Sequence, residues 1–247
     1  MTLLTTGKTK SVFVDDDNAR QVIMEFRDDI TAGNRRKSDV IDGRGAVNCY
    51  ISQLLFEELH KNLVKTHYIE QTSMTCLRCH RLAMVPLEFV VRNIAAGSLC
   101  RETYIQEGTV LNQYSPLVEI YLKDDELGDP LVTDARLVRM GYKPRDIDHL
   151  ICAAHRVNSV LKPLFDAIGY DLVDFKVELG YDADMRILVA DELSPDNCRI
   201  RKKGTGLSYD KDIYRQDVHD TEEQKREVLE KYQELATHLM AHCSHAT

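Results

Sequence analysis

Alternating apolar and polar positions, interrupted by short polar turns, predict β-strands in several parts of the chain. Residues 7–13 and 21–27 flank an acidic turn at 15–18 and are predicted to form a β-hairpin. Residues 82–92 predict another strand. Pro86 within it indicates a sheet edge or a bulge, because proline has no amide hydrogen to donate to a neighbouring strand.

Apolar residues at helical spacing predict amphipathic helices over residues 45–63, 145–168 and 221–242. The last of these opens with Thr221-Glu-Glu, which is typical of a helix start. Along the chain, the predicted elements follow the order strands, helix, strands, helix, hairpin and helix. This order predicts a two-lobed α+β protein with largely antiparallel sheets, divided into residues 1–80 and 81–247.

A second hairpin is predicted where the apolar runs 172–180 and 187–196 flank a turn. It places Glu178 and Asp191 near one face of a sheet. Charged groups in such strands are costly unless they are compensated. Two explanations stay open: a salt bridge with Lys176 in an edge strand, or a Mg²⁺ site that carries nucleotide phosphates.

Composition narrows the class of protein. The chain has 247 residues, of which 43% are hydrophobic and 29% charged, and this is typical of a globular protein. The net charge of −8 opposes general nucleic-acid binding and favours small-molecule partners. We find no apolar run long enough to span a membrane and no signal-peptide pattern, so we expect a cytoplasmic protein without a membrane partner.

The seven cysteines support the same location, because an odd number scattered among apolar positions favours reduced thiols over a disulfide framework. Cys76-Leu-Arg-Cys-His80 has the spacing of a c-type haem attachment site. That chemistry belongs to exported proteins, so we interpret these thiols as part of a strand or its surroundings.

Two lysine-bearing segments could bind nucleotide phosphates. Gly7-Lys8-Thr9-Lys10 offers flexible backbone amides and two ammonium groups beside a strand. Lys123 lies in a polar segment just before residues 124–134, a loop that could border a cleft. The alternative is that all three lysines are solvated on surface turns.

Two arginines, in segments far apart along the chain, could hold a phosphate monoester. Arg92 ends an apolar strand and precedes Ser98 in a glycine-containing loop, and Arg199 follows the second hairpin. The alternative is that these arginines cap strands or pair with Glu88 and Glu192. Further along, Lys211 and Arg215 lie in a predicted polar loop that could reach an anionic substrate, with a solvated approach to a helix as the alternative.

Taken in order, six segments resemble the SAICAR synthetase family, and the resemblance covers nearly the whole chain. The segments are Gly7-Lys-Thr-Lys10, Phe26-Arg-Asp-Asp-Ile-Thr-Ala-Gly-Asn34, Val85-Pro-Leu-Glu-Phe-Val-Val-Arg-Asn-Ile-Ala-Ala-Gly-Ser98, the run 172–180, Ala190-Asp-Glu-Leu-Ser-Pro-Asp196 and Asp210-Lys-Asp212.

The resemblance implies an ATP- and Mg²⁺-dependent ligase of purine biosynthesis. It would join the carboxylate of the aminoimidazole ribonucleotide CAIR to L-aspartate through an acyl phosphate, releasing ADP and phosphate. It also implies an ATP cleft between the two lobes, of which residues 1–80 bind nucleotide and residues 81–247 bind ATP and substrate. A homodimer is expected from the family and from the frequency of twofold dimers.

The resemblance also implies a role for each candidate residue. Glu178 and Asp191 would hold Mg²⁺, and Asp174 and Lys176 would face the reacting carboxylate and ribose. The remaining residues would bind ATP (Lys8, Lys10 and Lys123), bind the 5′-phosphate of the nucleotide substrate (Arg92, Ser98 and Arg199) or border the same pocket (Lys211 and Arg215).

Two departures from the family pattern leave alternatives open. The first departure is in the first long helix, where two asparagines are usual and this chain has Asn48-Cys49, with Arg44 before it. The second follows Arg199, where an aromatic residue and an acid are usual and this chain has Ile200-Arg-Lys-Lys-Gly204. The added positive charge leaves open a paralogous ligase that acts on a related heterocyclic nucleotide carboxylate. A phosphotransferase and a nucleotide-binding protein without turnover are the further alternatives.

Overall fold

The computed structural model describes residues 1–32, 37–111, 115–216 and 221–245, which form two five-stranded sheets, a two-stranded ribbon and six helices. Gly33 and Asn34 of the second family-like segment lie outside the described residues. The strands are β1 (Thr2–Thr6), β2 (Lys10–Val14), β3 (Gln21–Phe26), β4 (Asp29–Ala32), β5 (Lys37–Val40), β6 (Tyr68–Ser73), β7 (Cys76–His80), β8 (Ala83–Arg92), β9 (Leu117–Leu122), β10 (Tyr170–Tyr181), β11 (Ile187–Ala190) and β12 (Cys198–Lys202).

Every strand pair in the described ladders is antiparallel, as predicted. The first sheet has the order β1-β2-β3-β7-β6, and the second has the order β11-β10-β8-β9 with β12 also paired to β10. The helices are α1 (Arg44–Lys61), α2 (Ser98–Glu102), α3 (Asp134–Arg139), α4 (Pro144–Ala167), α5 (Asp212–Arg215) and α6 (Thr221–His245).

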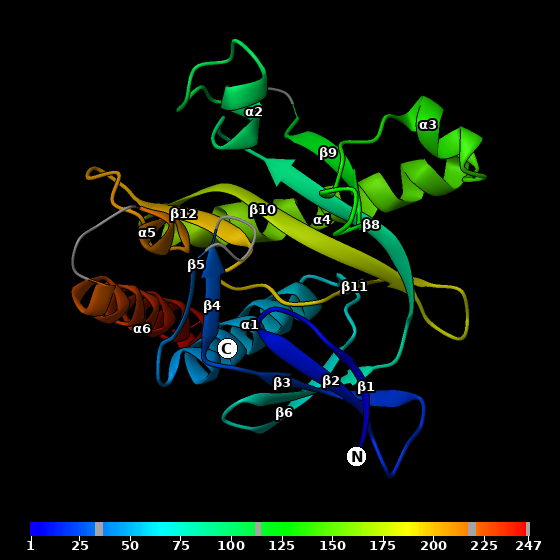
Figure 1. Ribbon diagram of the computed structural model, residues 1–247, viewed down its shortest axis with the longest axis horizontal. Coiled ribbons are helices and arrows are strands. Elements are labelled where there is room, and N and C mark those ends of the chain that lie inside the picture. The colour runs from blue at the N-terminus through cyan, green and yellow to red at the C-terminus, as the bar shows by residue number, and fades with distance from the viewer. Residues whose placement is uncertain (33–36, 112–114, 217–220, 246–247) are drawn as a thin grey trace.

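The two sheets lie in different parts of the molecule, the first in the lower half of Figure 1 and the second, with the long strands β8 and β10, in the upper half. Helix α1 lies between them and packs against β3, β6 and β7 as well as against α4 and α6. Helix α4 packs against β10 of the second sheet. Among the described helices, none is long and apolar enough to cross a membrane.

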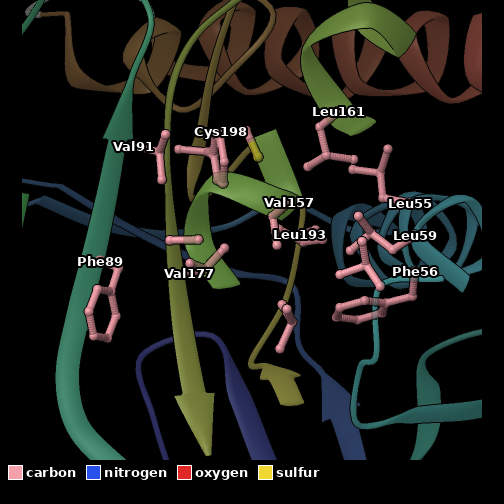
Figure 2. Packing of buried hydrophobic residues seen from close by; sticks show 14 of the residues in the cluster. Leu55, Phe56, Leu59, Phe89, Val91, Val157, Leu161, Val177, Leu193 and Cys198 are labelled. Carbon is pink, nitrogen blue, oxygen red and sulfur yellow. The ribbon is translucent and has the colours of Figure 1, made fainter. Parts of the chain in front are cut away.

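One hydrophobic core joins both sheets and the helices between them. In Figure 2, Phe89 of β8 and Val177 of β10 lie on one side, and Phe56 of α1 lies on the other. Val157 of α4 and Leu193 fill the space between these two groups. All five side chains are fully buried. The predicted apolar faces of α1 and α4 therefore meet the sheets, whereas α6 packs on α1. The two sheets are positioned by a shared core.

Local patterning predicted both hairpins, the strand over 82–92 and the three long helices. The bounds agree to within a few residues except in the second hairpin, where β11 ends at Ala190 and not at residue 196. Strands β1, β4, β5, β6 and β9 and the three short helices were not predicted. Pro86 lies at a bulge, since Gly180 pairs with Met84 while Glu178 pairs with Glu88. The sheet-edge alternative for Pro86 is wrong, because β8 is paired on both sides, by β10 and by β9.

Strand β12 was not predicted, and its sequence explains why. Cys198 and Ile200 are buried in alternation, but three basic residues in five hide that apolar pattern. The strand pairs with the first half of β10. Cys76-Leu-Arg-Cys-His80 forms β7, as interpreted, and all seven cysteines are free thiols.

Candidate active site

A cluster of lysines and carboxylates connects the first sheet to the second hairpin. Lys10 of β2 directs its Nζ to Oδ1 of Asp191 and to Oε1 of Glu192, each at 2.5 Å, and only 13% of its side chain is exposed. The interpretation of Lys10 as a solvated surface residue is therefore wrong. Lys8 is more exposed and pairs with Asp125 at 3.1 Å, in the loop that we expected to border a cleft.

Lys176 of β10 lies at the centre of this cluster. Its Nζ donates to Oε1 of Glu178 (2.7 Å), Oε1 of Glu88 (2.9 Å) and Oδ2 of Asp191 (3.3 Å). Lys123 approaches the other oxygen of Glu178, with 2.5 Å between Nζ and Oε2. The predicted salt bridge with Lys176 is thus present. Its placement in an edge strand is wrong, because β10 lies between β8 and the pair β11 and β12.

These groups hold one another in their charged forms. Burial by itself would lower the pKa of Lys176, but Asp191, Glu178 and Glu88 raise that pKa well above its ordinary value. Burial would raise the pKa of Asp191, yet Lys10 and Lys176 hold it well below the usual range. Lys176 and Asp191 therefore present fixed opposite charges at neutral pH.

The backbone at Asp191 is unusual. Asp191 follows the end of β11 and has a φ of 62°, in the left-handed region that few residues other than glycine adopt. The ring of His67 donates from Nε2 to the carbonyl oxygen of Asp191 at 3.0 Å and fixes this turn. Such strain is common where a side chain must be aimed at a ligand.

A metal ion brought in with a nucleotide fits this donor set. Across the described residues, no three His, Cys, Asp or Glu side chains converge on a metal position. Glu178 and Asp191 nevertheless present two carboxylates around one ammonium group, that of Lys176. Mg²⁺ is usually bound by one or two carboxylates together with phosphate oxygens and water. The pair suits Mg²⁺ bound to a nucleotide better than a metal held by protein alone.

A cavity of about 870 Å³ adjoins the cluster at Lys176. Its walls combine basic and acidic side chains from β8, β10 and β12 with those around α5. It is lined by all seven residues that we expected to act on or bind the nucleotide substrate: Arg92, Ser98, Asp174, Lys176, Arg199, Lys211 and Arg215. A larger cavity of about 1100 Å³ lies near the tip of the β10–β11 hairpin, and none of the predicted site residues lines it.

Asp174 organises the arginines of the 870 Å³ cavity. Its Oδ2 accepts from Nη1 of Arg92 at 2.8 Å and from Nη1 of Arg199 at 2.5 Å. Arg92 also donates to Ser98 Oγ at 2.8 Å and to Glu119 Oε2 at 2.6 Å. Burial raises the pKa of Asp174, and the two arginines only partly offset this effect. The hydrogen bonds to Asp174 therefore hold the guanidinium groups of Arg92 and Arg199 at the wall of the cavity.

The structure corrects two further expectations. The arginines do not pair with Glu88 and Glu192, because these carboxylates accept from Lys176 and Lys10. Arg215 lies on the short helix α5 and not in a loop. The predicted polar loop is therefore partly helical.

Three residues at the site were not identified as candidates from the sequence. Asp212 lines the cavity and binds Arg199, with 2.7 Å from Arg199 Nε to Oδ2; its place in Asp210-Lys-Asp212 was the available signal. Arg44 of α1 is fully buried and paired with Asp196, which also lines the cavity. An arginine at the start of an apolar helix was a sign of such a pair.

This arrangement defines a class of protein. A two-lobed α+β protein with clustered lysines and carboxylates beside an arginine-lined cavity can hold a metal-bound nucleotide next to a phosphorylated small molecule. The chain matches the SAICAR synthetase family over residues 3–232 and belongs to that family.

Known relatives resemble the chain over almost its whole length. It is 42% identical over 232 residues to the phosphoribosylaminoimidazole-succinocarboxamide synthase of Finegoldia magna, covering 94% of this chain and 99% of the relative. It is 44% identical over 229 residues to the enzyme of that name from Methanocaldococcus jannaschii, covering 92% and 93%.

Solved structures agree with these sequence relatives. A SAICAR synthetase in complex with ADP superposes with a TM-score of 0.84 and 38% identity, covering 92% of this chain and 96% of its own. The phosphoribosylaminoimidazole-succinocarboxamide synthase of Ehrlichia chaffeensis superposes with a TM-score of 0.88 and 34% identity, covering 97% and 98%. The expected fold and family are confirmed.

Proposed function

We propose that this protein is an ATP-dependent ligase of de novo purine biosynthesis, which joins the carboxylate of CAIR to L-aspartate and yields SAICAR, ADP and phosphate. The observation that carries the proposal is the position of Lys176, which contacts Glu178 and Asp191 and also lines the arginine-bearing cavity. A nucleoside triphosphate and a second phosphorylated substrate could therefore both contact the ammonium group of Lys176. The names of the relatives and the ADP complex of a related structure support the same reaction.

The chemistry requires activation of the carboxylate. An oxide is a poor leaving group, so a carboxylate oxygen of CAIR first attacks the γ-phosphorus of ATP and ADP departs. The amine of aspartate then attacks the carbonyl carbon of the acyl phosphate. Phosphate leaves with the bonding electrons, and the amine loses a proton.

Each residue has a proposed part in this sequence. Lys176 would balance the negative charge that develops as the phosphoryl group moves, and Asp174 would orient the ribose side of the substrate. Glu178 and Asp191 would hold Mg²⁺, which would neutralise charge on the transferring phosphoryl group. The remaining residues would bind ATP phosphates (Lys8, Lys10 and Lys123) or the 5′-phosphate of CAIR and its surroundings (Arg92, Ser98, Arg199, Lys211 and Arg215).

Larger-scale assignments belong to the same proposal. We retain residues 1–80 and 81–247 as the two lobes, with the boundary in the passage from β7 to β8. A homodimer is proposed from the frequency of twofold dimers, and sedimentation velocity would test it. A cytoplasmic location is supported by the seven free cysteines, which suit a reducing compartment.

Measurement of ADP release tests the reaction. ATP, Mg²⁺ and CAIR are incubated with the protein in the presence and absence of L-aspartate, and SAICAR is followed by its absorbance. A ligase forms SAICAR only with aspartate, whereas a phosphotransferase releases the same ADP without it. Replacing CAIR with related heterocyclic nucleotide carboxylates tests the paralogous alternative, and a higher kcat/KM for one of them would overturn the assignment of CAIR.

A variant links the reaction to the site. Lys176→Met is expected to lower kcat at least about 100-fold, since it removes a charge that faces the reacting groups. Lys231→Met is the matched control, because Lys231 lies on α6 and contacts Tyr209 outside the lysine–carboxylate cluster. Equal rates for the two variants would contradict the proposed role of Lys176.

A further inference from the structure

Arg201 lies beside the substrate cavity without lining it. It is on β12, two residues after Arg199, and 22% of its side chain is exposed. Its guanidinium group donates hydrogen bonds to two carboxylates. Nη2 donates to Oδ2 of Asp212 at 2.6 Å, and Nη1 donates to Oδ2 of Asp210. Arg201 therefore connects the strand to the acidic residues around the start of α5.

Asp212 is shared by three arginines, two of which line the cavity. Its Oδ2 accepts from Nε of Arg199 at 2.7 Å as well as from Arg201, and its Oδ1 accepts from Arg215. Although burial opposes ionisation, the pKa of Asp212 is held well below its ordinary value by these guanidinium groups. The carboxylate is thus ionised at neutral pH and depends on its partners.

Binding of a phosphate monoester would disturb this arrangement. A phosphate dianion competes with Asp212 for the forks of Arg199 and Arg215, because both anions accept the same charge-assisted hydrogen bonds. A partly buried carboxylate that loses its partners is strongly disfavoured. Arg201 does not line the cavity, so it can stay on Asp212 while Arg199 and Arg215 turn to the ligand.

The contact of Arg201 with Asp210 also stabilises the start of α5. Asp210 is 2% exposed, and its oxygens accept from the amides of Ile200 at 2.6 Å and Asp212 at 2.7 Å. It therefore fixes the start of α5 to β12. By neutralising Asp210, Arg201 stabilises the position of Asp212 as well as its charge.

We propose that Arg201 is a positioning residue for recognition of the substrate phosphate: it stabilises Asp212 while Arg199 and Arg215 bind the phosphate group. This inference rests on the proposed function. The family pattern usually has an aromatic residue and an acid after Arg199, and neither carries the positive charge with which Arg201 holds Asp212. The structure thus connects a departure from that pattern to the binding of the phosphorylated substrate.

The experiment compares a phosphorylated and a dephosphorylated substrate. Arg201→Met is expected to raise KM for CAIR about tenfold, the effect of one charge-assisted hydrogen bond, with KM for ATP unchanged. With the nucleoside that lacks the 5′-phosphate, kcat/KM is expected to equal that of the wild type. Lys202→Met is the matched control, since the adjacent Lys202 pairs with Glu234 on α6.

A general structural role predicts a different result. If Arg201→Met lowers kcat/KM equally for nucleotide and nucleoside, or leaves KM for CAIR unchanged, the proposal is wrong. If Arg201→Met does not fold, Arg201→Lys replaces it. A single ammonium group cannot reproduce the fork, so KM is expected to lie between the wild-type value and a tenfold increase, again only with the phosphorylated substrate.

Failure of the proposed reaction can be separated from failure of this inference. If the wild-type protein does not convert CAIR, calorimetric titration with ribose 5-phosphate replaces the kinetic assay. About tenfold weaker binding to Arg201→Met than to wild type or Lys202→Met would support the role of Arg201. Equal binding to all three proteins would overturn it.

Discussion

At the scale of single residues, ion pairs between partly buried side chains explain how the geometry of the candidate site is fixed before a ligand binds. Three side chains, those of Lys10, Lys176 and Asp191, are mostly shielded from water. Each is fixed by hydrogen bonds to two or more charged partners. The geometry is therefore formed before a ligand arrives, which lowers the entropy lost on binding. Neighbouring uncharged groups complete this arrangement, and His67 is the clearest example.

His67 should make stability depend on pH. It is 6% exposed and packs against Phe56, and burial lowers the pKa of its ring to about 4. Unfolded histidine binds a proton below about pH 6.5, whereas the folded ring stays neutral until about pH 4. The unfolded state thus binds more protons in this interval, and stability falls as pH falls. This group alone should remove about 2 kcal/mol between pH 7 and pH 5.

Urea unfolding of wild type and His67→Gln at pH 7 and pH 5 measures this effect. Glutamine keeps a hydrogen-bond donor for the carbonyl of Asp191 but does not titrate, so the variant should lose about 2 kcal/mol less over the interval. His149→Gln is the control because His149 is exposed on α4. The same pH dependence in wild type and His67→Gln would contradict the argument.

At the scale of elements, β10 is the scaffold of the site. It pairs with β8 along one side and with β11 and β12 along the other, and it carries Asp174, Lys176 and Glu178 at alternate positions. Alternation directs all three side chains to the same face of the strand. The substrate cavity and the lysine–carboxylate cluster are therefore adjacent because they share one strand.

Close packing of α1 on the end of β3 predicts an unusual effect of a helix substitution. In an ordinary helix, Gly→Ala stabilises by about 0.5–1 kcal/mol. At Gly45, however, an added Cβ would lie 2.9 Å from the carbonyl oxygen of Phe26 and 2.9 Å from the carbonyl carbon of Arg27. We expect Gly45→Ala to destabilise the protein by about 1–3 kcal/mol, measured by urea unfolding.

Gly7→Ala provides the comparison for Gly45→Ala. Its added Cβ would make an ordinary contact at 3.7 Å with the carbonyl oxygen of Lys10, so little change in the free energy of unfolding is expected. An increase in stability for Gly45→Ala would show that α1 can move away from β3 at little cost.

At the scale of the whole molecule, Lys10 connects the two sheets through its contacts with Asp191 and Glu192. A nucleotide bound between them would add further contacts to both, and a ligand that binds only the folded state stabilises it. With Mg²⁺-ATP at 100 times its Kd, the gain is about 2.7 kcal/mol, which corresponds to a rise in Tm of about 5–10 °C.

Scanning calorimetry with ATP in the presence of Mg²⁺ or of EDTA tests this expectation. Chelation should remove most of the rise in Tm, and Asp191→Asn should do the same. Asparagine suits this test because it tolerates the left-handed backbone of Asp191. A rise in Tm that is equal with Mg²⁺ and with EDTA would exclude Glu178 and Asp191 as metal ligands.

The sequence by itself determined the three long helices and the two hairpins, because their signals are local: apolar spacing, turn residues and start signals within a few positions of one another. It also indicated the seven residues that line the substrate cavity, since Arg92, Asp174 and the others lie in short segments typical of the family. Local signals reach no further than one element.

Only the tertiary structure decided which charges meet. Lys10 and Asp191 are 181 positions apart, and Arg44 and Asp196 are 152 apart, so no spacing along the chain reveals either pair. The sharing of Asp212 by three arginines also depends on tertiary structure, since β12 and α5 come together there. These contacts depend on how the common core brings the sheets together, and that is set by packing over the whole molecule.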